Sequence, residues 1–317
     1  MTKLLSEILN VTFIVSLLTI TLKLATPILL AAIGDTFSQR SGILNLGLEG
    51  VMIMGALAAF LGTFFSGSLI VGLLCAIIVS TLFNLFMGYL SISLNANQII
   101  AGTAITILGL GLSAFSYRAF IGVQSLPPQV EPFKNIAIPL LSDIPILGPI
   151  LFNQNVLVYF ALIMVVVAHI IMNKTVFGLK VKAVGENPKA ADSKGISVKK
   201  VRYAAMAISG AMTGLAGAFI SVGYMNMFID SMTQGRGFIA ISVVVFAGWS
   251  PKKTFFGAVL FAGVYALQSR LQAIGVPVPF QFLLALPYIL TITVLVMVSK
   301  KAKFPAAYTL PFYRGRR

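Results

Sequence analysis

Long apolar runs separated by short polar breaks fill most of this chain. A helix needs about 20 apolar residues to cross a bilayer, and most of the runs reach that length. Lys23 lies inside the first run, where a charge is costly, so it must face protein or reach the membrane interface. The pattern predicts an all-α, polytopic membrane protein with about nine transmembrane helices (8–10), at residues 10–33, 43–62, 68–91, 96–120, 154–173, 203–229, 236–249, 254–271 and 280–299.

Three other segments have a different composition. Residues 121–153 contain six prolines, which lack the N–H that a helix interior requires, so we expect an ordered external loop. The 174–202 loop holds eight Lys and Arg, and short basic loops stay on the cytoplasmic side. The basic tail, 300–317, follows the last apolar run, so we place it in the cytoplasm too. Counting crossings back from these two anchors puts the N-terminus outside.

The apolar runs form two similar sets around a connecting helix at 154–173. Each set has a charged break, then a short glycine-rich segment, then two spans. The crossing count gives the two sets opposite directions. We therefore expect one transmembrane domain built from two inverted repeats with broken helices, at 10–120 and 203–299. In such folds the substrate passes near the repeat interface, beside the broken helices.

The composition changes this picture little. With 58% hydrophobic residues, 10% charged residues and a mean hydropathy of +0.97, the chain cannot be a soluble domain. The net charge of +15 could indicate a nucleic-acid partner. However, 14 of the 23 Lys and Arg lie in the 174–202 loop and the basic tail, where they orient a chain in the cytoplasmic membrane and its lipid. The charge therefore argues against nucleic acid.

The sequence contains no arrangement typical of catalysis. It has no Gly-x-x-x-x-Gly-Lys-Ser/Thr phosphate loop, so the chain does not bind ATP itself. One cysteine, Cys75, and one histidine, His169, cannot form a metal cluster or a disulfide framework. No Ser-His-Asp set or pair of carboxylates is present. We expect no catalytic residue, no metal and no cofactor.

Three ionisable residues lie within or beside apolar sequence. Glu49 is in a glycine-rich apolar segment, and Asp230 and Arg236 flank the shortest apolar run. Charged groups at membrane depth are costly and usually face a cavity or a partner, so these residues are candidates for a substrate pathway. The alternative for Glu49 is a structural pair with Arg40 near the cytoplasmic interface.

Three amide side chains are further candidates for the pathway. Asn45, Asn97 and Gln98 carry donors and acceptors that suit sugar hydroxyls or the edge of a nucleobase. They can equally form hydrogen bonds between helices, and for Asn97 and Gln98 the sequence favours that interpretation.

A short helix is expected inside the 174–202 loop. Asn187-Pro188 favours a helix start, because proline suits the first turn, and Gly195 is typical of a helix end. The helix should cover 188–194 at the cytoplasmic surface. It can be a docking helix for a soluble partner or part of an ordinary solvated loop.

Several motifs resemble those of a known family. Gly185-Glu-Asn-Pro-Lys-Ala-Ala-Asp-Ser-Lys-Gly-Ile-Ser-Val198, Val201-Arg-Tyr203 and Ser209-Gly-Ala-Met-Thr-Gly-Leu-Ala-Gly217 resemble the permease subunits of bacterial ATP-binding-cassette (ABC) importers. Ser41-Gly-Ile-Leu-Asn-Leu-Gly-Leu-Glu-Gly50, Ala96-Asn-Gln98 and Gly235-Arg-Gly-Phe-Ile-Ala240 are similar to the ribose, galactose and branched-chain-amino-acid permease superfamily, most closely to its nucleoside permeases. The resemblance covers about 24–299.

The resemblance implies a function and partners. Such a permease moves nucleosides by alternating access, driven by a cytoplasmic ABC ATPase, and works with a second related permease and an extracytoplasmic substrate-binding lipoprotein. It also implies that the helix after Gly185 couples to the ATPase, through Glu186, Asn187, Pro188, Ala191, Asp192 and Gly195.

Other functions remain open on the sequence. Within the importer class, ribose or galactose is the main alternative substrate. A secondary transporter driven by protons through Glu49 and Asp230 is a second class, and a membrane scaffold without transport is a third.

Overall fold

The computed structural model describes residues 11–124, 126–139, 141, 142, 144–274, 279–299 and 303–313. Residue 10 of the expected first helix, and 300–302 and 314–317 of the basic tail, lie outside the described residues. The helices are α2 (Val11–Arg40), α3 (Leu48–Ser66), α4 (Leu69–Gly88), α5 (Gln98–Ile121), α6 (Val156–Lys174), α7 (Val176–Glu186), α8 (Pro188–Ser193), α9 (Val198–Ala218), α10 (Arg236–Phe246), α11 (Pro251–Ile274) and α12 (Phe280–Ser299), with π-helical turns η1 (Tyr89–Ser93), η2 (Gly148–Phe152) and η3 (Phe219–Met225).

The prediction of a polytopic all-α membrane protein is confirmed. Within the described residues, seven helices are long and apolar enough to cross a membrane, counting η1 with α4 and η3 with α9. α10 and residues 281–294 of α12 are shorter apolar helices. α10 has only 11 residues, as expected for a broken helix. The one described strand pair lies in and just after the proline-rich segment 121–153, where β1 (Asn135–Ala137) runs antiparallel to β2 (Asn153–Asn155).

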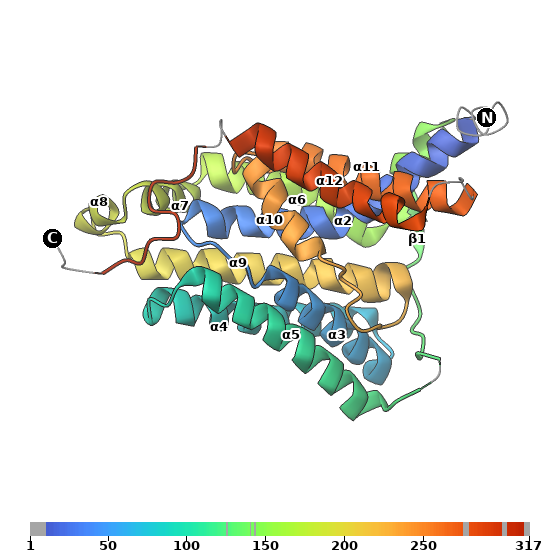
Figure 1. The fold of residues 1–317 in the computed structure, drawn as a ribbon, viewed down its shortest axis with the longest axis horizontal. Coiled ribbons are helices and arrows are strands. Elements are labelled where there is room, and N and C mark those ends of the chain that lie inside the picture. The colour runs from blue at the N-terminus through green and yellow to red at the C-terminus, as the bar shows by residue number, and fades with distance from the viewer. Residues whose placement is uncertain are drawn as a thin grey trace.

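Helices of each half of the bundle pack against helices of the other half. α2 and α9 pack against each other at the centre and run in opposite directions (Figure 1). α4 of the first half packs on α9 of the second, and α11 of the second half packs on α2 of the first. In the same way α3 contacts α9 and α10 contacts α2. Each helix of α2–α5 that contacts the opposite half thus has a counterpart in α9–α12 that does the same, a pattern compatible with the expected inverted repeats.

The first helix continues well past its expected end at residue 33. Several side chains of its polar extension form hydrogen bonds inside the protein: the Thr36 hydroxyl donates to the Ala32 carbonyl oxygen at 2.8 Å, and Gln39 Nε2 donates to Asp35 Oδ2 at 2.6 Å. Polar groups that are paired internally need no contact with water, so they do not end a helix. α3 starts correspondingly late, at Leu48 instead of residue 43.

Most of the 174–202 loop is helical, whereas the sequence predicts a helix only at 188–194. Thr175 caps the start of α7, and its hydroxyl accepts a hydrogen bond from the Gly178 N–H at 3.2 Å. Val181 and Val184 of α7 are fully buried, while Lys180 on the other face is exposed. The exposed lysines hide this narrow apolar stripe in the sequence.

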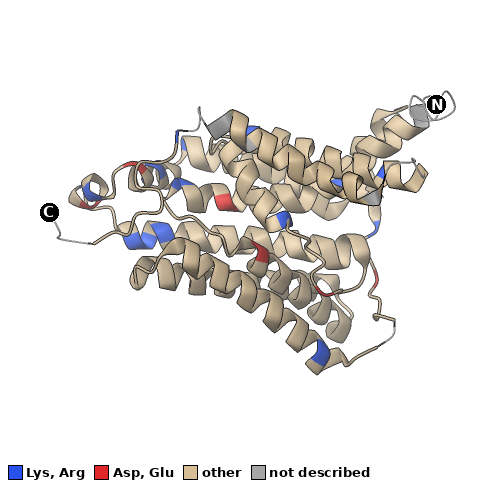
Figure 2. Ribbon diagram, viewed as in Figure 1, with Lys and Arg blue, Asp and Glu red and all other residues tan. Residues whose placement is uncertain are grey.

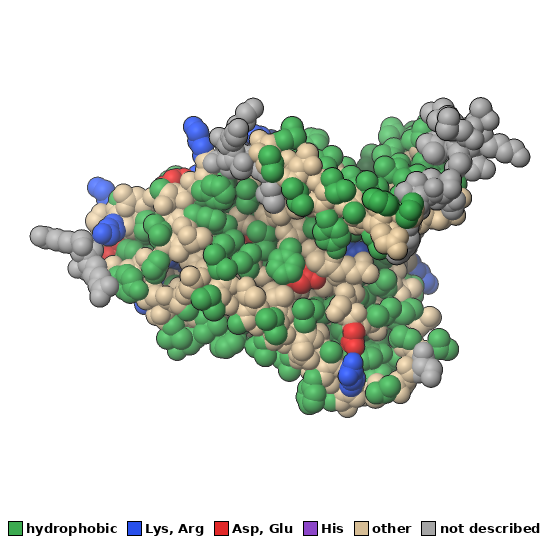
Figure 3. Space-filling view, viewed as in Figure 1, with side chains coloured by type: hydrophobic (Ala, Val, Ile, Leu, Met, Phe, Trp, Pro, Cys, Tyr) green, Lys and Arg blue, Asp and Glu red, His purple; other side chains and the backbone are tan. Residues whose placement is uncertain are grey.

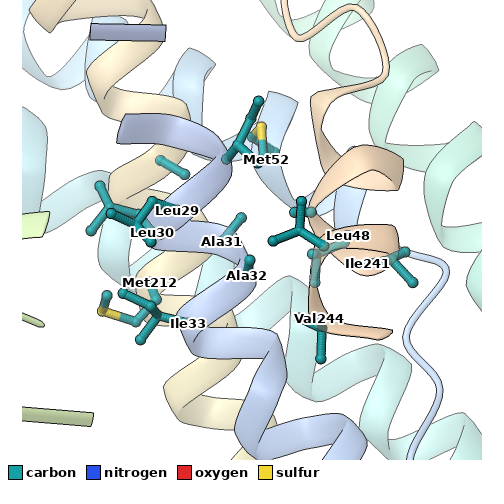
Figure 4. Close-up of a cluster of buried hydrophobic side chains, with 14 of the residues drawn as sticks. Leu29, Leu30, Ala31, Ala32, Ile33, Leu48, Met52, Met212, Ile241 and Val244 are labelled. Atoms are coloured by element: carbon teal, nitrogen blue, oxygen red, sulfur yellow. The ribbon is translucent and has the colours of Figure 1, made fainter. Parts of the chain in front are cut away.

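The core lies where the two halves meet. Figure 4 shows α2, α3, α9 and α10 contributing buried side chains to one cluster, which includes Leu29, Leu30, Ala31, Ala32, Ile33, Leu48, Met52, Met212, Ile241 and Val244.

Glycines let the helix backbones around this core touch. A methyl group on Gly214 would lie 2.6 Å from the Ala76 carbonyl oxygen of α4, and one on Gly210 would lie 2.8 Å from the Thr81 Cα. A methyl group on Gly217 would meet the Met52 carbonyl oxygen of α3. These three glycines therefore allow close helix contact.

Candidate functional site

The N-termini of the two broken helices, α3 and α10, meet about half-way along the bundle (Figure 1). Both helices have a glycine at the N-cap position, Gly47 and Gly235, so neither cap has a side chain that can accept a hydrogen bond. The first N–H groups of a helix have no partner within the helix and carry a partial positive charge. Their meeting creates a buried region rich in backbone donors.

Glu49, in the first turn of α3, supplies the acceptors for the end of α10. Its Oε1 accepts hydrogen bonds from the Gly235 N–H at 2.8 Å and the Thr233 hydroxyl at 2.5 Å, and its Oε2 accepts one from the Gly237 N–H at 2.7 Å. Glu49 is only 4% exposed. A carboxylate is the side chain best matched to a helix N-terminus, so Glu49 ties the first half of the bundle to the second.

Glycines make this close approach possible. A methyl group on Gly237 would lie 2.6 Å from the Cα of Glu49, and one on Gly109 of α5 would lie 2.6 Å from the Cα of Gly50. Real side chains do not come this close to backbone atoms. The glycines on both sides of Glu49 therefore set how tightly α3, α5 and α10 pack.

The surface beside these helix ends carries a mixed set of side chains. Arg236 is partly buried, and its Nη1 donates to the Met232 carbonyl oxygen at 3.1 Å. Gln234 is exposed, and the Phe238 ring, in the next turn, is 45% exposed. A guanidinium, an amide and an aromatic ring near this helix start can each bond to or stack on a polar molecule with a flat face.

Two of the predicted amides are buried in the packing of the first half. Asn45 Nδ2 donates to Asn84 Oδ1 at 2.7 Å, and Asn45 Oδ1 accepts from the Gly47 N–H at 3.1 Å. Gln98 Oε1 accepts from the Leu44 N–H at 2.8 Å. Asn45 therefore lies at the start of α3 close to Glu49, while Gln98 holds the loop before that start.

The remaining two candidates lie away from the helix ends. Asn97 caps α5, with its Oδ1 accepting from the Ile99 N–H at 2.9 Å. Asp230 forms an exposed ion pair with Arg118 at 3.2 Å, before the α10 segment. The structure thus brings together Asn45, Glu49 and Arg236.

The basic end of the bundle carries the predicted short helix. Figure 2 shows Lys and Arg gathered around α7, α8 and the start of α9. Asn187 caps α8 by accepting from the Ala190 N–H at 3.0 Å, and Gly195 has a φ of +79° just after the helix. The boundaries expected from Asn187-Pro188 and Gly195 are confirmed. Ala191 is buried, while Asp192 is partly exposed.

Glu186 lies at the junction of α7 and α8 and pairs with Arg40 at 3.0 Å. Arg40 is therefore engaged with the basic end of the bundle, and the alternative in which it pairs with Glu49 is wrong.

Thr233 and Asn84 belong to the site, although sequence reasoning did not find them. Thr233 lies in the polar break, two residues before Gly235. A hydroxyl residue at this distance before a glycine could have indicated that a helix starts there. Asn84 is a single amide in an otherwise apolar run, and its Nδ2 donates to the Met206 carbonyl oxygen at 2.6 Å. Its position in the run gives no sign of its partners.

Comparison with known proteins identifies relatives over almost the whole chain. Residues 17–298 match the family model described as branched-chain amino acid transport system, permease component. The guanosine ABC transporter permease protein NupQ of Bacillus subtilis is 37% identical, over 94% of this chain and 96% of its own length. The nucleoside ABC transporter permease protein NupC of Lactococcus lactis is 32% identical over 92% and 95%. TsgC13 of Haloferax volcanii, named as a glucose ABC transporter permease, is 37% identical over 83% and 80%.

A solved structure has the same fold. It is described as an ABC transporter of the metal-chelate type in an inward-facing conformation, and the superposition covers 90% of this chain and 85% of that chain with a TM-score of 0.52 and 15% identity. This likeness concerns the arrangement of the helices only.

Proposed function

Because the chain belongs to the family of branched-chain amino acid transport system permease components, we propose that it is the membrane-spanning permease subunit of an ABC importer for nucleosides. Two relatives named for guanosine or nucleoside transport match over nearly their full lengths, which supports this substrate class. ATP hydrolysis belongs to a partner subunit in this proposal.

The meeting of α3 and α10 at Glu49 carries the proposal. Broken helices that end inside the bilayer, at the interface of inverted repeats, are where transporters bind and pass their substrates. Here the two ends are joined by a carboxylate that accepts hydrogen bonds from three groups of the opposite half. Movement of one repeat against the other must change this contact, so the site can respond to alternating access.

The substrate passes the exposed side of the α10 start in this proposal. Glu49 positions the helix end and Arg236, Gln234 and Phe238 face the path. The guanidinium and amide can bond the edge of a base or the ribose hydroxyls, and the ring can stack on the base. A sugar would use the same hydrogen-bonding groups, so the aromatic ring is the feature that favours a nucleoside.

A second, related permease completes the path in our proposal. The start of α10 opens on a face where α5 and α12 expose apolar side chains (Figure 3). These include Ile107 at 67% and Phe115 at 70% on α5, and Tyr288 at 57% on α12. A polar path cannot be bounded by lipid alone, so the partner permease would supply the opposite wall. We propose a heterodimer, with an extracytoplasmic substrate-binding lipoprotein delivering the substrate.

The basic end of the bundle faces the cytoplasm in this proposal. The lysines around α7, α8 and α9 follow the charge bias of cytoplasmic segments, and the C-terminal tail lies at the same end. α8, held by its Asn187 cap, then acts as the coupling helix for the ABC ATPase, through Glu186, Asn187, Pro188, Ala191, Asp192 and Gly195.

Reconstitution of the whole importer tests the function. The permease pair, the ATPase and the binding protein are purified together and placed in liposomes with ATP, and uptake of labelled guanosine, uridine, ribose and galactose is measured. We expect uptake of nucleosides that requires ATP. Uptake of ribose or galactose without uptake of nucleosides would show that the substrate is a sugar. Uptake by the single chain under a pH gradient, without the ATPase, would indicate a secondary transporter and refute the proposal.

A further inference from the structure

The C-terminal segment 303–313, which we call the tail, folds back over the basic end of the bundle. Its Ala307 N–H donates to the Gly185 carbonyl oxygen at 2.9 Å, directly before the coupling region, and its Thr309 N–H donates to the Gly42 carbonyl oxygen at 3.0 Å, after α2. Arg202 Nη1 of α9 donates to the carbonyl oxygen of Leu310 at 3.3 Å. The tail is thus fixed to both repeats.

Gln39 of α2 is a residue inside the bundle to which the tail is hydrogen-bonded. Its Nε2 donates to Asp35 Oδ2 at 2.6 Å, which orients the amide so that Oε1 faces the tail. That oxygen accepts from Trp249 Nε1 at 3.0 Å and from the Tyr308 hydroxyl at 3.1 Å. Trp249 lies in the turn between α10 and α11, so one amide joins the first repeat, the second repeat and the tail.

Aromatic packing strengthens the same junction. The Trp249 ring lies 5.0 Å from the Phe304 ring and 6.2 Å from the Tyr308 ring, measured between centroids. Edge-to-face aromatic pairs favour a specific arrangement of the two rings, and they stabilise it in addition to burying apolar area. A displacement of the tail must therefore reach the α10–α11 turn.

The outer side of the tail forms one surface with α8. A hollow of about 400 Å³ lies between Pro188 and Lys189 on one side and Leu310 and Phe312 on the other. Phe312 also borders a second hollow, of about 170 Å³, beside Gly195 and Lys199. The Leu310 side chain is 55% exposed, so this surface has an apolar centre.

From this geometry we propose that the tail and α8 form a single docking surface for the partner ATPase, and that Gln39 and Tyr308 are positioning residues that pass its movement to both repeats. The proposal rests on the proposed function, which places an ATPase at α8. Exposed Lys189, Lys194 and Lys199 surround the apolar centre, so the matching ATPase surface has an apolar protrusion with acidic residues around it.

Capture of the ATPase by the permease pair in nanodiscs tests the docking. Leu310→Glu puts a charge into the apolar centre, and Leu126→Glu is the matched control, because Leu126 is 82% exposed in the external loop. We expect Leu310→Glu to weaken capture about ten-fold or more, as truncation at the centre of an interface does, and Leu126→Glu to leave it unchanged. Equal capture by wild type and Leu310→Glu, or a loss confined to binding of anionic vesicles, would overturn the docking surface.

The positioning role has its own test. Tyr308→Phe removes the hydroxyl that reaches Gln39 and keeps the ring on Trp249. Tyr159→Phe is its control, because that hydroxyl donates to the Ile136 carbonyl oxygen at 3.0 Å in the external loop. We expect Tyr308→Phe to capture ATPase within two-fold of wild type but to carry several-fold fewer nucleosides per ATP hydrolysed, while Tyr159→Phe keeps the wild-type ratio. An unchanged ratio in Tyr308→Phe would refute the role.

Failure of the docking proposal can be distinguished from failure of the proposed function. Capture of the ATPase needs no substrate, so it decides the docking proposal even if the wild-type complex carries no nucleoside. That result would refute the proposed substrate alone. A wild-type permease pair that captures no ATPase would refute both proposals.

Discussion

Glu49→Gln is the most direct test of how the two broken helices are held. The substitution keeps the length and shape of the side chain and removes its charge. The glutamine oxygen can still accept from the Thr233 hydroxyl and the Gly235 N–H at the Oε1 position. At the Oε2 position its NH₂ group then faces the Gly237 N–H, whose nitrogen is 2.7 Å away, and two donors cannot bond.

The contacts give the size of the effect. Leaving a buried N–H without an acceptor costs about 1–3 kcal/mol. The two remaining bonds also change from charged to neutral acceptors, which are roughly half as strong, and this adds about 1 kcal/mol. The free energy of unfolding should therefore fall by about 2–4 kcal/mol.

Thermal unfolding of the purified permease in detergent measures this loss. At about 2 °C per kcal/mol for a chain of this size, the midpoint should fall by about 4–8 °C. Glu131→Gln is the control, because Glu131 is exposed in the external loop and its substitution should change stability by less than about 0.5 kcal/mol. If Glu49→Gln unfolds at the same temperature as the control, the carboxylate does not hold the helix ends and the reasoning fails.

Three further predictions concern other parts of the molecule. Asn187→Ala removes the α8 cap and should leave the protein in the membrane while lowering nucleoside uptake per ATP in reconstituted importers; normal coupling would contradict the role of α8. Gly214→Leu should lower the yield of folded protein by forcing α9 from α4, whereas Gly111→Leu, with open space around its Cβ position, should not, as size-exclusion profiles will report. Burial, followed by the charge of Asp35, raises the pKa of Tyr308 above 10. The stabilisation from its protonated hydroxyl should be full below about pH 10 and be lost as the pH rises further, so between about pH 10 and 12 Tyr308→Phe should lose less stability than wild type.

The helices were predictable because lipid leaves little choice of structure. An apolar run of about 20 residues in a bilayer must satisfy its backbone internally, so run length alone locates most of the spans. Helix ends were harder to predict. Asp35 and Gln39 look like loop residues, yet their hydrogen bond lets α2 continue to Arg40. α7 was missed for the opposite reason, because its two lysines, Lys180 and Lys182, lie among its buried valines and break the apolar pattern.

The partners of the candidate residues could not be predicted. Glu49 was found because a carboxylate in apolar sequence is rare. Its acceptors, however, bind N–H groups of Gly235 and Gly237, and every residue except proline has a backbone N–H, so no residue type marks those positions. Asn97 and Gln98 were expected to form hydrogen bonds between helices, but Asn97 caps its own helix and Gln98 bonds the Leu44 N–H in the loop before α3. The sequence pattern thus locates a charged residue whose burial is unfavourable, while only the fold shows which hydrogen bonds offset that burial.

Glu49 and Gly237 occupy equivalent positions in the two repeats. Each lies two residues after its N-cap glycine, Gly47 and Gly235, and the two residues are in contact, because the Gly237 N–H donates to Glu49 Oε2. A Cβ on residue 237 would lie 2.6 Å from the Cα of Glu49, so only one of the two positions has room for a side chain. The single carboxylate therefore crosses from one repeat to bind the helix end of the other, and an exact repeat of the sequence could not form this contact.

A double-mutant cycle tests whether the two residues act as one contact. Gly237→Ala must push α10 away from Glu49, which stretches hydrogen bonds that are now 2.7 and 2.8 Å long, so it should lose much of what Glu49→Gln loses. Because both changes break the same bonds, the double variant should unfold only slightly below the worse single variant, with a coupling of about 1–3 kcal/mol. Losses that simply add would mean that Gly237 and Glu49 stabilise the bundle through separate contacts, and the joined helix ends would no longer account for the packing of the two repeats.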